Sequence, residues 1–251
     1  MKYLSRLKLG NYFRAAFDLV LPRVCVVCGR PLNLQESHIC LPCEMNFPYT
    51  HFELTRHNRM ADFYNERLSQ IMPDDYMPYQ WAIALMRYQS GSMYSHIPWA
   101  LKYNGNIPVG KYIAERLFYM IRRTPWLADV DMIIPVPVHR RRRFRRGYNQ
   151  AEVIAFRLGA LWGIKVNKHF LRKRKYTISQ VKVDTTLRHA NISGSFEVVQ
   201  RYIGEIAQVK HILLVDDVFT TGSTLAECHK TIRTALKRTI RISVATIACV
   251  E

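Results

Sequence analysis

The sequence lacks long apolar runs, and it lacks the pattern of an export signal. No stretch comes near the roughly 18 uninterrupted apolar residues that a membrane-spanning helix needs. The N-terminus has no clean apolar segment followed by a small-residue cleavage site. Internal repeats and low-complexity tracts are also missing, which argues against a solenoid or a compositionally biased chain. We therefore expect a cytoplasmic protein with no transmembrane segment.

Acidic residues are scarce. Asp and Glu together number 19 against 37 Lys and Arg, so the formal net charge is +18. The excess is local, because residues 139–190 contain 15 Lys or Arg and only two acids, a net charge of +13. The expected partners are therefore polyanions: a phosphorylated small molecule, a nucleic acid or an anionic membrane surface. A solvated basic face is the alternative.

Apolar residues are plentiful, since 49% of the chain is hydrophobic and 12% is aromatic. That composition is typical of a globular protein with a buried core. A length of 251 residues suits one large domain or an average domain with a small appendage. The first 21 residues fit a basic amphipathic helix, which we expect to dock on the protein's own core; contact with a membrane or a protein partner is the weaker alternative.

Four of the six cysteines form two CxxC pairs separated by eleven residues, Cys25 with Cys28 and Cys40 with Cys43. Each pair can aim two thiolates at one tetrahedral ion, and the spacing is close to that of structural zinc ribbons and knuckles. Disulfides are disfavoured without an export signal, which leaves redox or iron–sulfur chemistry as the alternative. We predict a closed, noncatalytic zinc site that folds only with its metal.

Strand and helix patterns alternate in the second half of the chain. This alternation predicts an α/β fold with a largely parallel sheet covered on both faces, and ligands of such sheets bind at the carboxyl ends of the strands. Cys228 and Cys249 fall inside predicted elements and are expected in the core. The predicted strands are residues 81–88, 132–138, 165–167, 211–215 and 241–249, and the predicted helices are residues 110–123, 149–162 and 223–236.

Residues 212–225 carry the most informative pattern. Four apolar residues predict a buried strand, and Asp216 and Asp217 follow where we expect that strand to end. A hydroxyl-rich loop around Gly222 then opens a helix. Such a segment offers carboxylates to sugar hydroxyls and backbone N–H groups to a phosphate. An ordinary capped helix explains the hydroxyl residues equally well, but it does not explain two adjacent, mutually repelling acids.

This pattern resembles the phosphoribosyl pyrophosphate signature of type I phosphoribosyltransferases, without a gap. Nearly the whole chain resembles the ComF-like proteins, whose members place a zinc module before such a domain. Tyr148 stands where an aromatic residue, often Phe, is usual. The matching segments are the CxxC pairs, residues 101–105, 134–139, 146–152 and 177–180, and Arg188, Asn191 and Gly194.

The resemblance implies a type I phosphoribosyltransferase fold for residues 51–251, behind a helix and zinc-binding module in residues 1–50. It also implies roles for single residues. Asp216 and Asp217 would be the catalytic pair that binds the ribose hydroxyls, with Mg²⁺ bridging ribose and pyrophosphate. The 5′-phosphate would be cradled by Thr220, Thr221, Gly222, Ser223 and Thr224, and the pyrophosphate loop would be Pro135, Val136 and Pro137.

Six arginines occupy residues 140–146, directly after the implied pyrophosphate loop. Some would neutralise the leaving pyrophosphate, and the number suggests a second use on a nucleic-acid backbone. Aromatic residues interrupt this run too rarely for base stacking. Residues 171–191 resemble the loop that closes over the ligand in related transferases. From the two segments we expect substrate-side roles for Arg146, Gln180 and Arg188, with a surface role as the alternative.

Two functions follow from these expectations. One is transfer of ribosyl 5-phosphate from phosphoribosyl pyrophosphate to an acceptor, within the DNA-uptake and competence role that the resemblance implies. The other is a noncatalytic phosphoribosyl pyrophosphate sensor that holds single-stranded DNA and contacts proteins of a DNA-uptake machinery. Both functions use the same pocket, so only a test of whether transfer is catalysed can distinguish them.

Overall fold

The computed structural model describes residues 22–75, 77–174 and 194–250. At its centre is a five-stranded sheet with the order β1-β7-β6-β2-β3, in which every neighbouring pair is parallel. The strands are β1 (Ala82–Tyr88), β2 (Met132–Pro135), β3 (Lys165–Val166), β6 (His211–Phe219) and β7 (Arg241–Val250). A second, two-stranded antiparallel sheet pairs β4 (Leu171–Lys173) with β5 (Phe196–Val198). The predicted α/β class with a mostly parallel sheet is confirmed.

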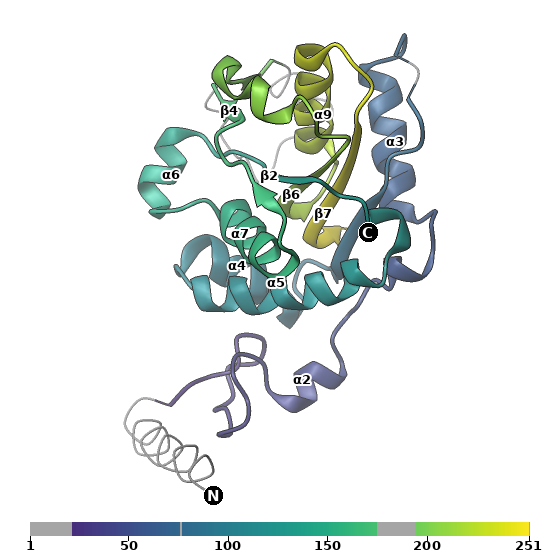
Figure 1. The fold of residues 1–251 in the computed structure, drawn as a ribbon. Coiled ribbons are helices and arrows are strands. Elements are labelled where there is room, and N and C mark those ends of the chain that lie inside the picture. Colours follow the sequence, from purple (N-terminus) through teal and green to yellow (C-terminus); the bar gives the residue numbers. More distant parts are fainter. Residues whose placement is uncertain (1–21, 76, 175–193, 251) are drawn as a thin grey trace, which may run out of the picture.

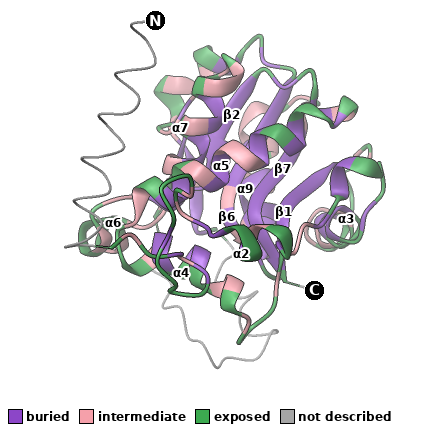
Figure 2. Cartoon of the chain, turned by 90° about the horizontal axis from the view of Figure 1, so that it is seen from below, coloured by how far each residue is buried: buried purple, intermediate pink, exposed green. Residues whose placement is uncertain are grey.

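Helices cover both faces of the sheet (Figure 1). On one face α5 (Ile107–Arg122) packs against α7 (Gln150–Trp162), and on the other α3 (Arg59–Ile71) packs against α9 (Ser223–Leu236). The central strands consequently carry buried side chains, as Figure 2 shows in purple. The remaining helices of the described residues are α2 (Leu41–Met45), α4 (His96–Tyr103) and α6 (Arg140–Arg146). The 3-10 turns there are η1 (Phe52–Leu54), η2 (Met93–Ser95), η3 (Pro125–Leu127) and η4 (Gln200–Ile206).

The strand order reverses between β2 and β6. From β2 the chain crosses through α7 to β3 on one side, and from β6 it crosses through α9 to β7 on the other. Crossovers that diverge in this way leave a crevice at the carboxyl ends of the two strands, which is where open α/β sheets bind ligands. The residues after β2 and at the end of β6 are therefore the first place to look for a site.

β6 is longer than the sequence suggested. We expected the strand to end at Val215, before the two acids, but Asp216 pairs with Thr246 of β7 and the ladder continues to Phe219. The error came from assuming that the strand ends at its first charged residue, Asp216. In contrast, β2 ends at Pro135, earlier than the predicted residue 138, because the prolines at residues 135 and 137 have no N–H to donate to a neighbouring strand.

The other predicted elements recur with small shifts. The helix expected at residues 223–236 is α9, and Cys228 and Cys249 are buried as predicted. The helix expected from residue 110 starts at Ile107, because the Asn106 side chain accepts a hydrogen bond from the Val109 N–H and caps it. Across the described ranges, no helix has both the length and the apolar character needed to cross a bilayer.

Candidate functional site

Two adjacent carboxylates lie near the carboxyl end of β6. Successive residues of a strand project to opposite faces of its sheet, so the Asp216 and Asp217 side chains diverge. Asp217 is buried, and its Oδ2 lies 3.1 Å from Nζ of Lys102 on α4. Burial favours the neutral amine, but the Asp217 carboxylate outweighs this effect and raises the pKa of Lys102. Asp217 thus already has a counter-ion.

Asp216 is the less well compensated of the two carboxylates. Burial, and then the charge of Asp217, raise the pKa of Asp216 to about 7. Three groups oppose this rise: the Asp217 backbone N–H, which donates to Asp216 Oδ1 at 2.8 Å, and the ammonium groups of Lys102 and Lys173. A carboxyl group held in this state gains from a hydroxyl donor or a cation, which marks Asp216 as a candidate ligand-binding group.

The turn after β6 needs a glycine for two reasons. Gly222 has a φ of 65°, in the left-handed region that side chains disfavour, and a Cβ there would lie 2.8 Å from the Phe219 ring. Gly222 is also the N-cap of α9, and the hydroxyls of Thr221 and Ser223 lie 2.9 Å apart beside it. Within the described residues no side chain caps this helix. Its first N–H groups are thus suited to an anion.

The segment after β2 is fixed against β6. The Val136 N–H donates to the Val215 carbonyl at 2.8 Å, between Pro135 and Pro137. The Asn149 amide donates to the Val136 carbonyl at 3.0 Å and also caps α7. The predicted pyrophosphate loop and the strand that carries the aspartates therefore meet at the reversal of strand order.

The four N-terminal cysteines form one cluster. The Sγ atoms of Cys25, Cys28, Cys40 and Cys43 all lie within 4.8 Å of one another, and those of Cys28 and Cys40 are 3.6 Å apart. A tetrahedral zinc site with Zn–S bonds of about 2.3 Å separates its sulfur atoms by about 3.8 Å. The cluster could therefore hold a metal ion such as zinc, as the spacing predicted.

The protonation of these thiols also suits a divalent cation. Burial opposes ionisation of Cys25, but the backbone N–H groups of Cys28, Cys40 and Val27 outweigh it and lower the pKa of Cys25 to about 7. Burial and the neighbouring thiols raise the pKa of Cys43. Four thiolates can therefore coexist here only around a positive charge, and a bound metal ion supplies one.

The cysteine module is attached to the start of α4. His96 Nδ1 lies 2.9 Å from the Val27 carbonyl, and because a carbonyl only accepts, this nitrogen carries the proton. The Tyr94 hydroxyl donates to the Cys43 carbonyl at 2.9 Å. The helix that supports the module is also the helix that carries Lys102.

Residues 140–146 form the short helix α6, whose side chains lie largely in solvent. Phe144 is 92% exposed. At the end of the helix the Arg146 guanidinium lies 5.4 Å from the centre of the Tyr103 ring on α4, and that ring lies 5.8 Å from Trp99. The sequence predicted too few aromatic side chains for base stacking, because that prediction considered only the residues of the basic run itself. The fold adds aromatic residues from another segment.

The remaining predicted site residues have different outcomes. Gln180 and Arg188 lie outside the described residues, and Arg146 faces Tyr103 as stated above. Sequence reasoning did not identify Lys102 or Lys173 as single site residues, although each lies in a segment that it singled out. The sequence signal that could have indicated Lys102 is a charged lysine on a short, largely apolar helix.

The fold and these groups define an α/β protein with a polar site where the strand order of a parallel sheet reverses, and with a separate four-thiol centre. No family model matches the chain. It is 31% identical to competence protein F of Haemophilus influenzae over 135 residues, which span 53% of this chain and 58% of that protein.

Its similarity to the DNA utilization protein YhgH extends further along the chain. The YhgH of Escherichia coli O157:H7 is 27% identical over 225 residues, and that of strain K12 is 26% identical over 224 residues. Both matches cover 83% of this chain and 90% of the relative. These similarities support a ComF-like family for this chain.

Proposed function

We propose that this protein binds phosphoribosyl pyrophosphate, together with Mg²⁺, at the reversal of strand order between β2 and β6. The observation that carries the proposal is the convergence of three segments there: the 135–137 loop, the two aspartates and the turn at Gly222. Each suits a different part of one ligand. A sugar carrying phosphate groups at both ends needs carboxylates in the middle and N–H groups on either side.

The parts of the ligand are assigned as follows. Asp216 and Asp217 would accept hydrogen bonds from the ribose hydroxyls, and the loop of Pro135, Val136 and Pro137 would face the pyrophosphate. The 5′-phosphate would lie on the first turn of α9. Its partners would be the backbone and hydroxyl groups of Thr220, Thr221, Gly222, Ser223 and Thr224.

The donor set fits Mg²⁺, a hard cation that prefers oxygen ligands and retains several waters. Burial, and then the charge of the adjacent Asp217, raise the pKa of Asp216, and a divalent cation would relieve the repulsion between the two acids. When bound, the ion would also neutralise charge on the pyrophosphate. Lys173 from β4 lies close enough to Asp216 to affect its pKa, so the small sheet contributes a further cation beside the site.

Thermal unfolding with and without phosphoribosyl pyrophosphate and Mg²⁺ tests this proposal. At 100 times its dissociation constant the ligand should add about 2.7 kcal/mol to the free energy of unfolding. The gain should require Mg²⁺ and disappear in the double variant Asp216→Asn/Asp217→Asn. The matched control is Asp74→Asn, at an exposed aspartate, which should retain it. An unchanged melting temperature in the wild type at saturating ligand would contradict the proposal.

The proposed chemistry is transfer of the ribosyl 5-phosphate group to an acceptor, with release of pyrophosphate. Breaking the bond at the anomeric carbon leaves positive charge on the sugar and negative charge on pyrophosphate. The cations around the site would stabilise the negative charge on pyrophosphate. The alternative is a noncatalytic sensor that uses the same pocket. Ligand binding without pyrophosphate release in the presence of any acceptor tried would favour the sensor.

The names of the relatives support a role in DNA uptake or DNA use, which we propose for this protein as well. The feature that favours direct contact with a single strand is α6, where exposed arginines lie beside exposed Phe144 and, through Arg146, beside Tyr103. Cations that track phosphates and aromatic rings that stack on bases are the two components of such surfaces.

A salt titration separates this DNA contact from the pocket. Each phosphate contact contributes about −0.7 to the slope of log affinity against log salt for single strands, so Arg140→Ala/Arg145→Ala should flatten the slope by about 1.4. The control Lys111→Ala/Lys210→Ala removes two exposed cations elsewhere and should leave the slope unchanged. Identical slopes in the wild type and the α6 variant would rule out α6 as the contact.

The chain organisation that goes with this function is also proposed. Residues 1–50 would form the helix and zinc module, and residues 51–251 the phosphoribosyl pyrophosphate-binding domain. The protein would work in the cytoplasm, in contact with proteins of a DNA-uptake machinery. Separate expression of residues 51–251 tests the boundary, since a cooperative unfolding transition is expected if that part has its own core.

A further inference from the structure

The four cysteines of the N-terminal cluster are unequally shielded from solvent. Cys25 and Cys40 are each 1% exposed and Cys43 is 7% exposed, whereas Cys28 is exposed. Cys28 also lines an open cavity of about 470 Å³ between the cysteine module and α4. A small solute can therefore approach the cluster at one corner, Cys28, while protein atoms cover the side chains of the other three cysteines.

Backbone donors add to the protection of a buried sulfur. The Cys40 N–H donates to Cys25 Sγ at 3.4 Å, and the N–H groups of Val27 and Cys28 donate to the same sulfur. Hydrogen bonds that stabilise a thiolate also lower its nucleophilicity. Cys25 is thus protected both by burial and by its donors, which leaves Cys28 as the corner of the cluster that is open to an electrophile.

A second thiol stands within reach of Cys28. The Sγ atoms of Cys28 and Cys40 are 3.6 Å apart, which is close to van der Waals contact. A disulfide bond is about 2.0 Å long, so the two sulfurs would have to approach each other by about 1.6 Å to form one. The two residues belong to different CxxC pairs, so this bond would join the two turns of the module.

We propose that Cys28 is an oxidation site for hydrogen peroxide and that Cys40 is the thiol that resolves it. In the first step the Cys28 sulfur bonds to one peroxide oxygen, the O–O bond breaks, and a sulfenic acid and one water are formed. In the second step the Cys40 sulfur bonds to the Cys28 sulfur. The hydroxyl leaves with the Cys40 S–H proton as a second water. The two sulfurs together lose two electrons, and the peroxide gains them.

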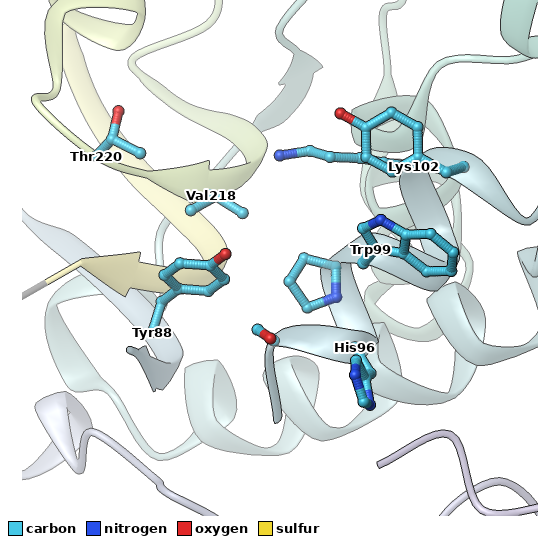
Figure 3. Close-up of a pocket in the computed structure, with 9 residues that line it drawn as sticks. Tyr88, His96, Trp99, Lys102, Val218 and Thr220 are labelled. Atoms are coloured by element: carbon cyan, nitrogen blue, oxygen red, sulfur yellow. The ribbon is translucent and has the colours of Figure 1, made fainter. Parts of the chain in front are cut away.

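The disulfide would change both the module and its support of α4. It would remove two of the four thiols that can hold a metal ion, so oxidation and metal binding exclude each other. It would also pull on the turn whose Val27 carbonyl accepts the hydrogen bond from His96. Figure 3 shows His96 and Lys102 on the same helix, α4, with the Lys102 side chain extending toward β6. Oxidation at Cys28 thus acts on the helix that carries the counter-ion of Asp217.

The purified full chain, loaded with zinc and freed of reductant, tests this proposal with hydrogen peroxide as the probe. Dimedone, which traps sulfenic acids, should label Cys28 before any other cysteine. Without dimedone, the zinc released to a colorimetric chelator should equal the Cys28–Cys40 disulfide formed, mole for mole. Protease cleavage after Glu36 separates the two CxxC pairs, so mass spectrometry of the joined peptides identifies that bond. Dithiothreitol and fresh zinc should restore the metal content.

Cys228 is the control within the same chain, because it is fully buried and should stay reduced. Cys28→Ser should form no disulfide between the two pairs at the same dose of peroxide, and the matched variant Cys228→Ser should react as the wild type does. If Cys28→Ser does not fold, the dimedone result in the wild type decides alone. First labelling at Cys25, Cys40 or Cys43, a disulfide within one CxxC pair, or zinc that stays bound to the disulfide form would each overturn the proposal.

Discussion

Replacing Asp216 with asparagine should stabilise the ligand-free protein while removing its ligand response. The ionised carboxyl is unfavourable in the folded state, because burial and the Asp217 charge raise its pKa to about 7. The unfolded chain ionises that group near pH 4. Between these values the folded state binds the extra proton, so the contribution of Asp216 to the free energy of unfolding falls as the pH rises from about 4 to about 7.

The size of the effect follows from that shift. A difference of about three pKa units corresponds to about 4 kcal/mol, and the partial exposure of Asp216 reduces this to about 1–2 kcal/mol. For a chain of this length, that is an increase in melting temperature of about 3–6 °C. Asp216→Asn should therefore match the wild type near pH 4 and exceed it by this amount at pH 8.

Urea unfolding at several pH values measures this difference directly. The control Asp74→Asn, at an exposed acid, should stay within about 0.5 kcal/mol of the wild type at every pH. The reasoning is refuted if Asp216→Asn is less stable than the wild type at pH 8, or if the difference between them does not grow with pH. A stabilised variant that also loses the response to phosphoribosyl pyrophosphate would identify Asp216 as a group kept for binding at a cost in stability.

Three further predictions concern other parts of the molecule. Gly222→Ala should lower the free energy of unfolding by about 1–2 kcal/mol, through its positive φ and the nearby Phe219 ring, and should abolish ligand-induced stabilisation in the same thermal assay. Elemental analysis should find about one zinc per chain in the wild type and none in Cys40→Ser, whose melting temperature should also be lower. Less than about half an equivalent of zinc, with no iron, would contradict the zinc site. Burial lowers the pKa of His211 to about 4, so its contribution to stability should fall as the pH drops from about 6.5 to about 4; His211→Gln should lack that slope in urea unfolding.

Local patterns predicted the fold well where a single physical rule decided the outcome. Four cysteines at ribbon spacing form one cluster because each CxxC turn fixes its own pair. The helix that starts at Ser223 begins after a glycine with positive φ and runs to Leu236 as expected. The predicted end of β6 was wrong. Pairing with β7, which is distant from β6 in the sequence, continues through two acids that local reasoning assigned to a loop.

The surroundings of the aspartates were less predictable, since they depend on contacts between distant segments. Lys102 lies 115 positions before Asp217 in the chain, and only the packing of α4 beside β6 brings the two together. The same holds for the Arg146 guanidinium over the Tyr103 ring. A basic run without aromatic neighbours in sequence can still form a mixed surface in space, because helix packing sets the neighbours of an exposed side chain.

The position of α4 gives a physical reason for a small four-cysteine module in a protein of this kind. An eight-residue helix is about 12 Å long. At its first residue His96 bonds to the Val27 carbonyl, between the cysteines of the first CxxC pair, and near its last turn Lys102 pairs with Asp217. If the four thiols hold a metal ion, its loss would release the loop that holds His96, and α4 would then lose one of the contacts that fix its N-terminal end. Because Trp99 lies between these two residues, the same helix connects the four-thiol centre, the paired rings of Trp99 and Tyr103, and the carboxylates of β6. A module too small to have its own core can in this way set the position of a binding surface.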